Sequence, residues 1–302
     1  MLETLIHIAV LLLLPPLLPG VIAKTKAWFA GRTGPSVFQP YYDIVKCLQR
    51  SWVLSETTTW IFWAGPIITL AATLLAGLMV PLGRAAAPIA FTGDLILFAY
   101  LFALARFFTT SAALDTGSAF EGMGAAREVT FGCLSEPALF FAFMVLAKIS
   151  GTLSLTPMLH APATAFAAGI TAPLMLILIG LFIVLLAETC RVPVDDPNTH
   201  LELTMIHEAM ILDHSGPLYG IILYGSAMKM LVLGSMVLQV LLAFLPEREM
   251  LRGPLFLVLL VLLAVVIGIV ESVMARLKML HVPYLLISAL LFCSFAFILL
   301  IR

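Results

Sequence analysis

Six ionisable side chains stand inside or at the edges of long apolar segments, and their placement is the strongest hint of chemistry. They are Arg106, Glu136, Lys148, Glu188, Lys229 and Glu271. A charge at the centre of a bilayer costs about 2.5–3.5 kcal/mol or more, so such residues are functional candidates by default. Acids and lysines at staggered depths suit a proton path, because each group can exchange a proton or bias its neighbour. Any single member could instead snorkel or form a structural pair, and this alternative is strongest for Glu136 and Glu271.

A second set of charges follows the end of one apolar segment, in ETCRVPVDD at residues 188–196. If helical geometry persists to Pro193, then Glu188 and Arg191 share a face and can pair. Pairing would lower the cost of burying both charges and would favour the ionised form of Glu188. Asp195 would pair with Arg191 or face a cavity. A purely structural ion pair that caps the span remains the alternative.

Histidines and cysteines do not form recognisable metal sites. Metal-binding histidines are usually closer than the seven-residue spacing of His200, His207 and His214, and His207-Glu208 lacks the second histidine of HExxH. No cysteine pair has CxxC spacing, so we expect no zinc and no iron–sulfur cluster on this chain. The four cysteines, read as buried thiols, are Cys47, Cys133, Cys190 and Cys293.

The composition predicts the elements that position these groups. The chain is 62% hydrophobic and only 11% charged, whereas soluble domains carry about 25% charged residues. A net charge of −1 gives no field that would attract nucleic acid. We therefore expect an all-α membrane protein, with residues 1–302 forming a single integral membrane domain. A span needs about 20 apolar residues, and the predicted spans lie near 2–22, 60–82, 92–112, 134–155, 171–190, 217–245, 254–275 and 282–301.

The distribution of lysine and arginine predicts the orientation. Nine of these residues fall in the odd-numbered connections, and only Arg84, Arg248 and Arg252 fall in the even-numbered ones. Positive loops stay in the cytoplasm, so both termini of an eight-span chain should face outward. Arg106, Glu136, Glu188 and Glu271 should then lie in the cytoplasmic third, with Lys148 and Lys229 deeper.

The predicted cytoplasmic connections are long and polar, at 23–59, 113–133 and 191–216. Long connections that are not low-complexity are usually functional, so we expect ordered loops. Within the first one, Tyr41, Ile44, Val45 and Leu48 recur at helical spacing opposite polar residues. This pattern predicts a short amphipathic helix at the membrane interface.

Three motifs, in order and on the same predicted side, resemble a known family. They are GRTGPSVFQPYYDIVKCLQR at 31–50, GAAREVTFGCLSE at 124–136, and ETCRVPVDD followed by DHSG at 213–216. They resemble the family of membrane-anchor subunits that respiratory complex I shares with group 4 [NiFe] hydrogenases. The hydrogenase branch of this family comprises the formate hydrogenlyase subunit 4 and hydrogenase-4 component C type. The resemblance covers nearly the whole chain.

The resemblance implies a subunit without a redox cofactor of its own, in the prokaryotic cytoplasmic (inner) membrane. It would couple the peripheral redox arm to proton- or ion-translocating subunits. Its partners would be lipid, [NiFe] hydrogenase-like large and small subunits, a ferredoxin-like iron–sulfur subunit and antiporter-like membrane subunits. The [NiFe] centre and iron–sulfur clusters would lie in those other subunits.

Matching positions carry the implied roles. The proton-path and coupling residues are Glu136, Lys148, Glu188, Arg191, Asp195, Glu202, Asp213 and Lys229. The cavity-lining or partner-facing loop residues are Arg32, Gln39, Asp43, Lys46 and Arg127.

One departure separates two candidate functions. The complex I members follow the third motif with an acidic run, of which only Glu202 remains here. This loss favours the hydrogenase type over the quinone-chamber subunit of an NADH-quinone oxidoreductase. An independent secondary transporter is the third alternative, and it usually shows paired halves around a midplane site. No such halves are visible in this sequence.

Overall fold

The computed structural model describes residues 2–83, 86–162, 170–195, 205–244 and 252–301, and every regular element in these ranges is a helix. The helices are α1 (Leu2–Leu13), α2 (Leu17–Phe29), α3 (Gln39–Leu48), α4 (Trp60–Met79), α5 (Asp94–Asp115), α6 (Ala119–Ser150), α7 (Leu155–His160), α9 (Thr171–Glu188), α10 (His207–Met210), α11 (Gly216–Leu242), α12 (Arg252–Val273), the 3₁₀ helix η2 (Met279–His281) and α13 (Val282–Ile301).

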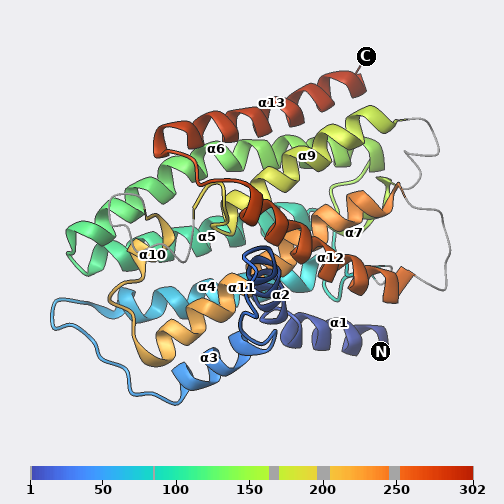
Figure 1. The fold of residues 1–302 in the computed structure, drawn as a ribbon. Coiled ribbons are helices and arrows are strands. Elements are labelled where there is room, and N and C mark those ends of the chain that lie inside the picture. The colour runs from blue at the N-terminus through green and yellow to red at the C-terminus, as the bar shows by residue number, and fades with distance from the viewer. Residues whose placement is uncertain (1, 84–85, 163–169, 196–204, 245–251, 302) are drawn as a thin grey trace.

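The predicted multi-pass membrane architecture is confirmed. Within the described ranges, seven helices are long and apolar enough to cross a membrane, and the pair α1–α2 adds an eighth if it counts as one span bent by 49°. Figure 1 shows the long helices side by side, with both marked termini toward the right of the view. Most helix ends lie within three residues of the predicted spans, because apolar length alone determines where a helix can cross lipid.

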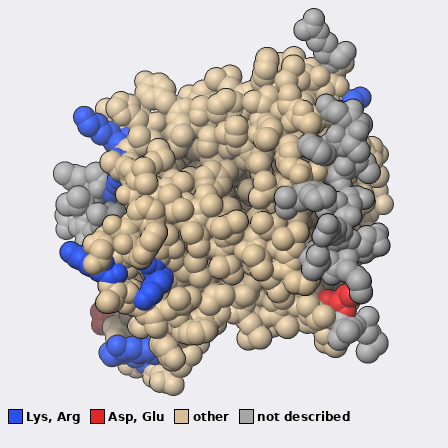
Figure 2. Space-filling model, turned by 45° about the vertical axis from the view of Figure 1, so that its right-hand side comes forward, with Lys and Arg blue, Asp and Glu red and all other residues tan. Residues whose placement is uncertain are grey.

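Charged groups gather at one end of the bundle, which we call the loop end. It comprises the segments 30–59, 116–118, 189–195, 205–215 and 274–281. Figure 2 shows a broad band without coloured charged side chains across the middle of one face, and most visible basic side chains lie at one end. A band of this kind fits a lipid-facing surface.

The prediction of a loop at 113–133 is wrong. Helix α6 begins at Ala119 and continues without a break to Ser150, so most of that segment is helical. The charged residues of this extension, Glu121, Arg127 and Glu128, contact other parts of the protein. Glu121 is fully buried and accepts a hydrogen bond from the backbone N–H of Asp213 at 3.0 Å. Protein contacts of this kind replace the water that a polar segment would otherwise need.

The predicted amphipathic helix is confirmed as α3. It packs against α2 and α11, and Tyr42, Val45 and Leu48 point outward as exposed apolar side chains. Gly220 of α11 permits the close approach, because an added Cβ would lie 3.1 Å from Cβ of Cys47. The Tyr41 hydroxyl also donates to the backbone oxygen of Leu13, where α1 ends.

Helix α11 lies at the centre of the bundle. It contacts α2, α3, α4, α9 and α12, and most of its second half is buried. Any charged residue on this helix must therefore find a partner inside the protein. Lys229 is such a residue, and its surroundings define the candidate site.

Candidate functional site

Five charged residues from four spanning helices meet near the loop end. We call them the charge cluster: Arg106 of α5, Glu128 and Glu136 of α6, Glu188 of α9 and Lys229 of α11. Glu188 lies at the centre, with Oε1 2.5 Å from Nη2 of Arg106 and Oε2 2.8 Å from Nζ of Lys229. Two basic groups serve three carboxylates, so the cluster holds one negative charge in excess when every member is ionised.

The other two acids approach Arg106 from α6. Glu128 Oε1 lies 3.8 Å from Nε of Arg106, and Glu136 pairs with Nη1. Glu136 keeps 44% of its side chain exposed, whereas Glu188 keeps 8%. The cluster therefore runs from a buried carboxylate at the centre to a half-exposed one at the outer face of α6.

Small residues of α6 make room for these contacts. An added Cβ at Gly132 would overlap the guanidinium of Arg106, so only glycine leaves space for this side chain. One helical turn further on, the Ser135 hydroxyl donates to Oε1 of Glu188 at 2.5 Å. The interhelical hydrogen bond and the ion pairs together satisfy a carboxylate that lipid could not solvate.

The end of α9 separates Glu188 from Arg191. Cys190 has φ of +53°, in the left-handed region. The N–H of Cys190 bonds to Ala187 O and that of Arg191 to Leu186 O, which is a Schellman motif with cysteine in place of the usual glycine. Helical geometry therefore stops before Arg191, and the predicted Glu188–Arg191 pair is wrong.

Arg191 instead joins a second network. Its Nη1 lies 3.5 Å from Oε1 of Glu271 on α12, and Nζ of Lys26 on α2 lies 2.8 Å from Oε2 of the same carboxylate. The Glu271 side chain is fully buried. This network joins α2 and α12 to the segment after α9.

A third network fixes the position of α10. Asp195 Oδ1 lies 2.6 Å from Nη2 of Arg276, and its Oδ2 accepts from the N–H groups of Ile206 and His207 at 3.3 and 3.2 Å. Asp195 was predicted to pair with Arg191 or to face a cavity. The pair with Arg191 is not seen, and Asp195 pairs with Arg276 and lines a small cavity beside Glu128 and Glu188. Asp195 ties residues 189–195, 205–207 and 274–281 together.

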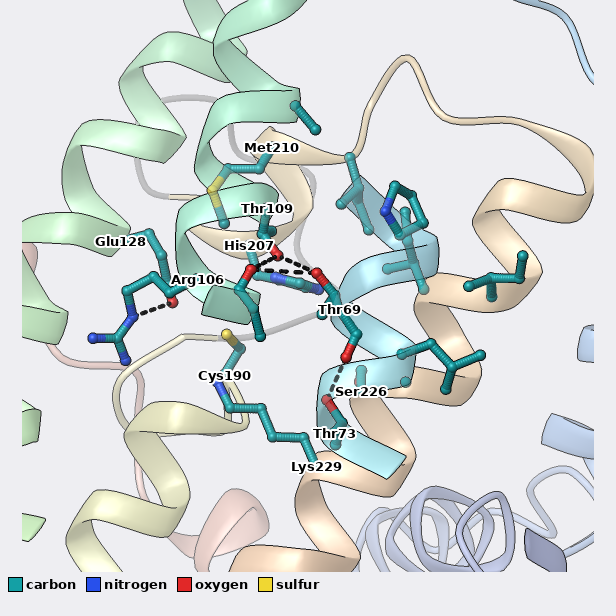
Figure 3. A pocket seen from close by; sticks show the side chains of 18 of the residues that line it. Thr69, Thr73, Arg106, Thr109, Glu128, Cys190, His207, Met210, Ser226 and Lys229 are labelled. Carbon is teal, nitrogen blue, oxygen red and sulfur yellow. Dashed lines mark hydrogen bonds and ion pairs between the residues drawn. The ribbon is translucent and has the colours of Figure 1, made fainter. Parts of the chain in front are cut away.

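Two cavities adjoin these networks. The inner cavity, of about 90 Å³, is bounded by Arg106, Glu128, Glu188 and Lys229. Figure 3 shows side chains from several elements pointing into it, including those of Thr69 and Thr109. The Oγ1 atoms of these two threonines are hydrogen-bonded at 3.0 Å. The outer cavity, of about 300 Å³, lies between α2, α3, α11 and α12 and is bounded by residues that include Lys26, Asp43, Arg191 and Glu271. Both are large enough for water molecules and have polar groups to bind them.

Burial shifts the acid–base behaviour of the connection that lies between the cavities. Burial lowers the pKa of His207 to about 4. The positive charge of Lys229 lowers this pKa further, whereas the negative charge of Asp195 raises it. Burial also lowers the pKa of His214, whose ring stacks on Phe62 with centroids 4.1 Å apart, to about 4. Burial and the nearby Asp195 raise the pKa of Glu208 to about 7.

The structure brings only some of the predicted site residues together. Glu136, Glu188 and Lys229 meet in the charge cluster, whereas Lys148 is exposed near the last turn of α6, at the opposite end from the loop end. The greater depth expected for Lys148 is therefore not seen. The Asp213 side chain is exposed on the loop end. Glu202 lies outside the described residues.

The first-loop residues and Arg127 have separate places. Gln39 donates to Oδ1 of Asp43 at 2.8 Å, and Asp43 lines the outer cavity. Arg32 and Lys46 are exposed at the loop end. Arg127 lies on α6 rather than in a loop, and it donates to the backbone oxygen of Met205 at 2.6 Å.

Sequence reasoning missed Glu128, Ser135 and Arg276 as parts of these networks. A signal existed for Glu128, because it precedes Glu136 by eight residues and such residues share a face of a continuous helix. Because residues 113–133 were predicted to form a loop, Glu128 and Glu136 were not expected to lie on one helix. Arg276 was counted only as a positive loop residue, since nothing in the sequence indicates that it contacts Asp195.

The described residues contain no group of three or more His, Cys, Asp or Glu side chains that could hold a metal ion. The expectation that this chain carries no redox cofactor stays a prediction.

Comparison with known proteins shows the family. The model of the NADH dehydrogenase family matches residues 2–302. The chain belongs to this family. Among its relatives, formate hydrogenlyase subunit 4 of Escherichia coli (strain K12) is 31% identical over 97% of this chain and 96% of its own length. Hydrogenase-4 component C of the same strain is 32% identical, over 91% of this chain and 89% of its own.

A solved structure shows the same fold. A chain of the membrane-bound sulfane sulfur reductase, an archaeal respiratory membrane complex, aligns over 98% of both chains with a TM-score of 0.78 at 22% identity. The resemblance inferred from the three motifs is thus confirmed. The curated relatives are subunits or components of larger assemblies, and the present chain is likewise a multi-pass subunit of a multi-subunit membrane complex.

Proposed function

We propose that this chain is the membrane-anchor and coupling subunit of a group 4 [NiFe] hydrogenase of the formate hydrogenlyase type. It joins a peripheral redox arm to subunits that translocate protons or other ions. The observation that carries the proposal is the charge cluster, in which Arg106, Glu188 and Lys229 from three spanning helices are joined by contacts of 2.5 and 2.8 Å. The two relatives with 31% and 32% identity support the hydrogenase type.

The redox centres belong to partner subunits in this proposal. The [NiFe] large subunit, the small subunit and a ferredoxin-like subunit carry the metal, and antiporter-like subunits adjoin the spanning helices. The loop end faces the cytoplasm and the peripheral arm, and both termini face outward across the prokaryotic inner membrane. The excess of Lys and Arg at the loop end supports this orientation.

The first test is the composition of the native complex. The tagged chain is purified in mild detergent, its partners are identified by mass spectrometry, and nickel is quantified. Co-purification of a [NiFe] large subunit, ferredoxin-like subunits and antiporter-like subunits, with nickel, is the expected result. Flavin-bearing, NADH-oxidising partners without nickel would contradict it.

The second test concerns coupling. In sealed vesicles that contain the complex, Glu188→Gln should lower the number of protons moved per hydrogen molecule, because it removes the central carboxylate of the cluster. The matched control is Glu3→Gln, since Glu3 is exposed at the start of α1. Unchanged proton movement in Glu188→Gln would remove the cluster from the coupling path.

The outer cavity supports a second candidate, the quinone-chamber subunit of an NADH-quinone oxidoreductase. Its volume of about 300 Å³ and its position between α2, α3 and α11 leave room for part of a ligand. The missing acidic run after Asp195 favours the hydrogenase type. Quinone-dependent NADH oxidation by the purified complex would support this second candidate.

A further inference from the structure

The two cavities are separated by a thin wall. Six residues line both of them: Thr189, Cys190, His207, Ile211, Ile222 and Ser226. The charge cluster adjoins the inner side of this wall, and the Lys26–Glu271–Arg191 network adjoins the outer side. A proton that moves between the networks by the shortest route must cross this wall.

Most of the wall residues are poor proton carriers. The two isoleucines have no exchangeable side-chain proton, and the Thr189 hydroxyl already donates to Leu185 O at 2.7 Å. Burial, reinforced by the charges of Glu128 and Asp195, raises the pKa of the Cys190 thiol well above its ordinary range. This thiol therefore stays protonated. Ser226 and His207 remain.

The imidazole of His207 has the chemistry that a relay needs. With its pKa near 4, the ring is neutral at pH 7. A neutral imidazole offers one N–H donor and one nitrogen acceptor at the same time, on opposite sides of the ring. The charged groups around it are Lys229 of α11, Arg106 of α5, Glu128 of α6, and Asp195 and Glu208 of its own connection.

The backbone around His207 is held firmly. Its N–H donates to Asp195, and Arg127 holds the carbonyl oxygen of Met205 two residues earlier. Gly124 of α6 allows α10 to pack closely, because an added Cβ would lie 2.8 Å from Ile206 O and 2.9 Å from Cβ of Ala209. Figure 3 shows His207 on the same cavity as Thr109, Cys190 and Lys229.

We propose that His207 passes protons between the outer and inner cavities, and thus between the Glu271 network and the Glu188–Lys229 pair. This inference rests on the proposed coupling function and names a residue for it. One ring nitrogen takes up a proton from the outer side, and the other releases its proton to the inner side. Exchange of the two tautomers restores the starting state, so one proton crosses and the ring keeps its charge.

The test uses the assembled complex in sealed vesicles. His207→Ala should lower the proton movement per hydrogen molecule by at least about tenfold, since a positioned acid–base group typically contributes about 100- to 10,000-fold. Hydrogen turnover with a soluble artificial electron carrier should stay within twofold. Added imidazole at millimolar concentration should restore much of the proton movement, because it fits the space that the missing ring leaves.

His214→Ala is the matched control. His214 lines the inner cavity but not the wall, and its ring stacks on Phe62. Imidazole should have no effect on the proton movement of this variant. His207→Gln keeps hydrogen-bonding groups without a titratable ring, so it separates proton transfer from packing. It should assemble normally and still lose proton movement.

The outcomes separate the two proposals. Normal proton movement in His207→Gln, together with a loss in Glu188→Gln, would overturn the relay and leave the coupling function standing. Normal movement in both variants would overturn the relay and also remove the charge cluster from the coupling path. A loss in His207→Ala that imidazole does not restore would assign His207 a structural role and also overturn the relay.

Discussion

Nζ of Lys229 lies 2.8 Å from Oε2 of Glu188, so a single ion pair joins the central helix α11 to the end of α9. Both side chains are largely buried, since only 24% and 8% of their surfaces are exposed. Removing Glu188 leaves the Lys229 charge without this ion pair, and breaking a buried pair in this way costs about 3–5 kcal/mol, whereas Glu188 keeps its contact with Arg106 when Lys229 is removed. The pair should therefore behave as a unit.

A double-mutant cycle tests this unit. Lys229→Met and Glu188→Gln should each lower the thermal midpoint of the detergent-solubilised complex, and the double variant should lose less than the sum. We expect a coupling energy within about 0.5–3 kcal/mol. Lys148→Met is the control, because Lys148 is exposed at the far end of α6. Simple additivity would show that the two residues do not depend on each other.

Replacement of Gly132 on α6 should disturb the charge cluster. An added Cβ overlaps the Arg106 guanidinium, so Gly132→Ala should displace this side chain and destabilise the protein by about 1–3 kcal/mol. On the same helix, a Cβ at Gly122 meets only Leu114 at 3.9 Å. Gly122→Ala should therefore be neutral or stabilise by up to about 1 kcal/mol, since alanine favours helix. Thermal unfolding of both variants gives the comparison, and equal effects would rule out the steric explanation.

Asp195 should stabilise α10 against local unfolding. In Asp195→Ala, the N–H groups of Ile206 and His207 lose their acceptor, which costs about 1–3 kcal/mol for each buried group left unsatisfied. Hydrogen exchange measured by mass spectrometry should become faster for residues 205–210. Asp213→Ala is the control, because that side chain is exposed. Unchanged exchange in Asp195→Ala would mean that other contacts hold α10.

His214 should make the protein less stable in mild acid. Its pKa is about 4 in the folded protein, below the ordinary value of 6.5. Between pH 6.5 and 4 the unfolded chain therefore binds a proton that the folded chain does not, and the free energy of unfolding falls as the pH drops. The loss is limited to about 3 kcal/mol, since one pKa unit corresponds to 1.36 kcal/mol.

His214→Phe removes this titration and keeps an aromatic ring against Phe62. The thermal midpoint of the variant should fall less than that of the parent protein between pH 7 and pH 5. Glu208 has the opposite effect on stability, because its pKa of about 7 lies above the ordinary value of 4.5. As the pH falls from 7 to 4.5, the folded chain binds a proton that the unfolded chain does not, and the free energy of unfolding rises. An identical decline in His214→Phe and the parent would contradict the assignment to His214.

Apolar length predicted most of the bundle but not the extent of α6. The segment with Glu121, Arg127 and Glu128 is too polar to read as a span, and it is helical because these side chains bond to Asp213, Met205 and Arg106. Those contacts come from distant parts of the sequence. A hydropathy pattern describes the fit of a helix to lipid, and it does not register a polar helix that is covered by its own protein.

The pairing of charges was equally hard to predict. Glu188 and Arg191 have the spacing of a helical ion pair. Cys190 between them has a left-handed backbone conformation that ends the helix, so the two side chains do not lie on one helical face. Sequence reasoning identified Glu136, Glu188 and Lys229 as important, since charges in apolar segments are rare. The partners depend on how α5, α9 and α11 pack, and this packing has no signature at short range.

The turn at Cys190 also makes the end of α9 a short mechanical link. Glu188 belongs to the inner network and Arg191 to the outer one, yet only three peptide bonds separate them. Such a tether spans at most about 11 Å even when fully extended. A shift of α2 or α12 that displaces Arg191 will therefore also displace Glu188 through the backbone. The two side chains do not have to be in contact for this coupling.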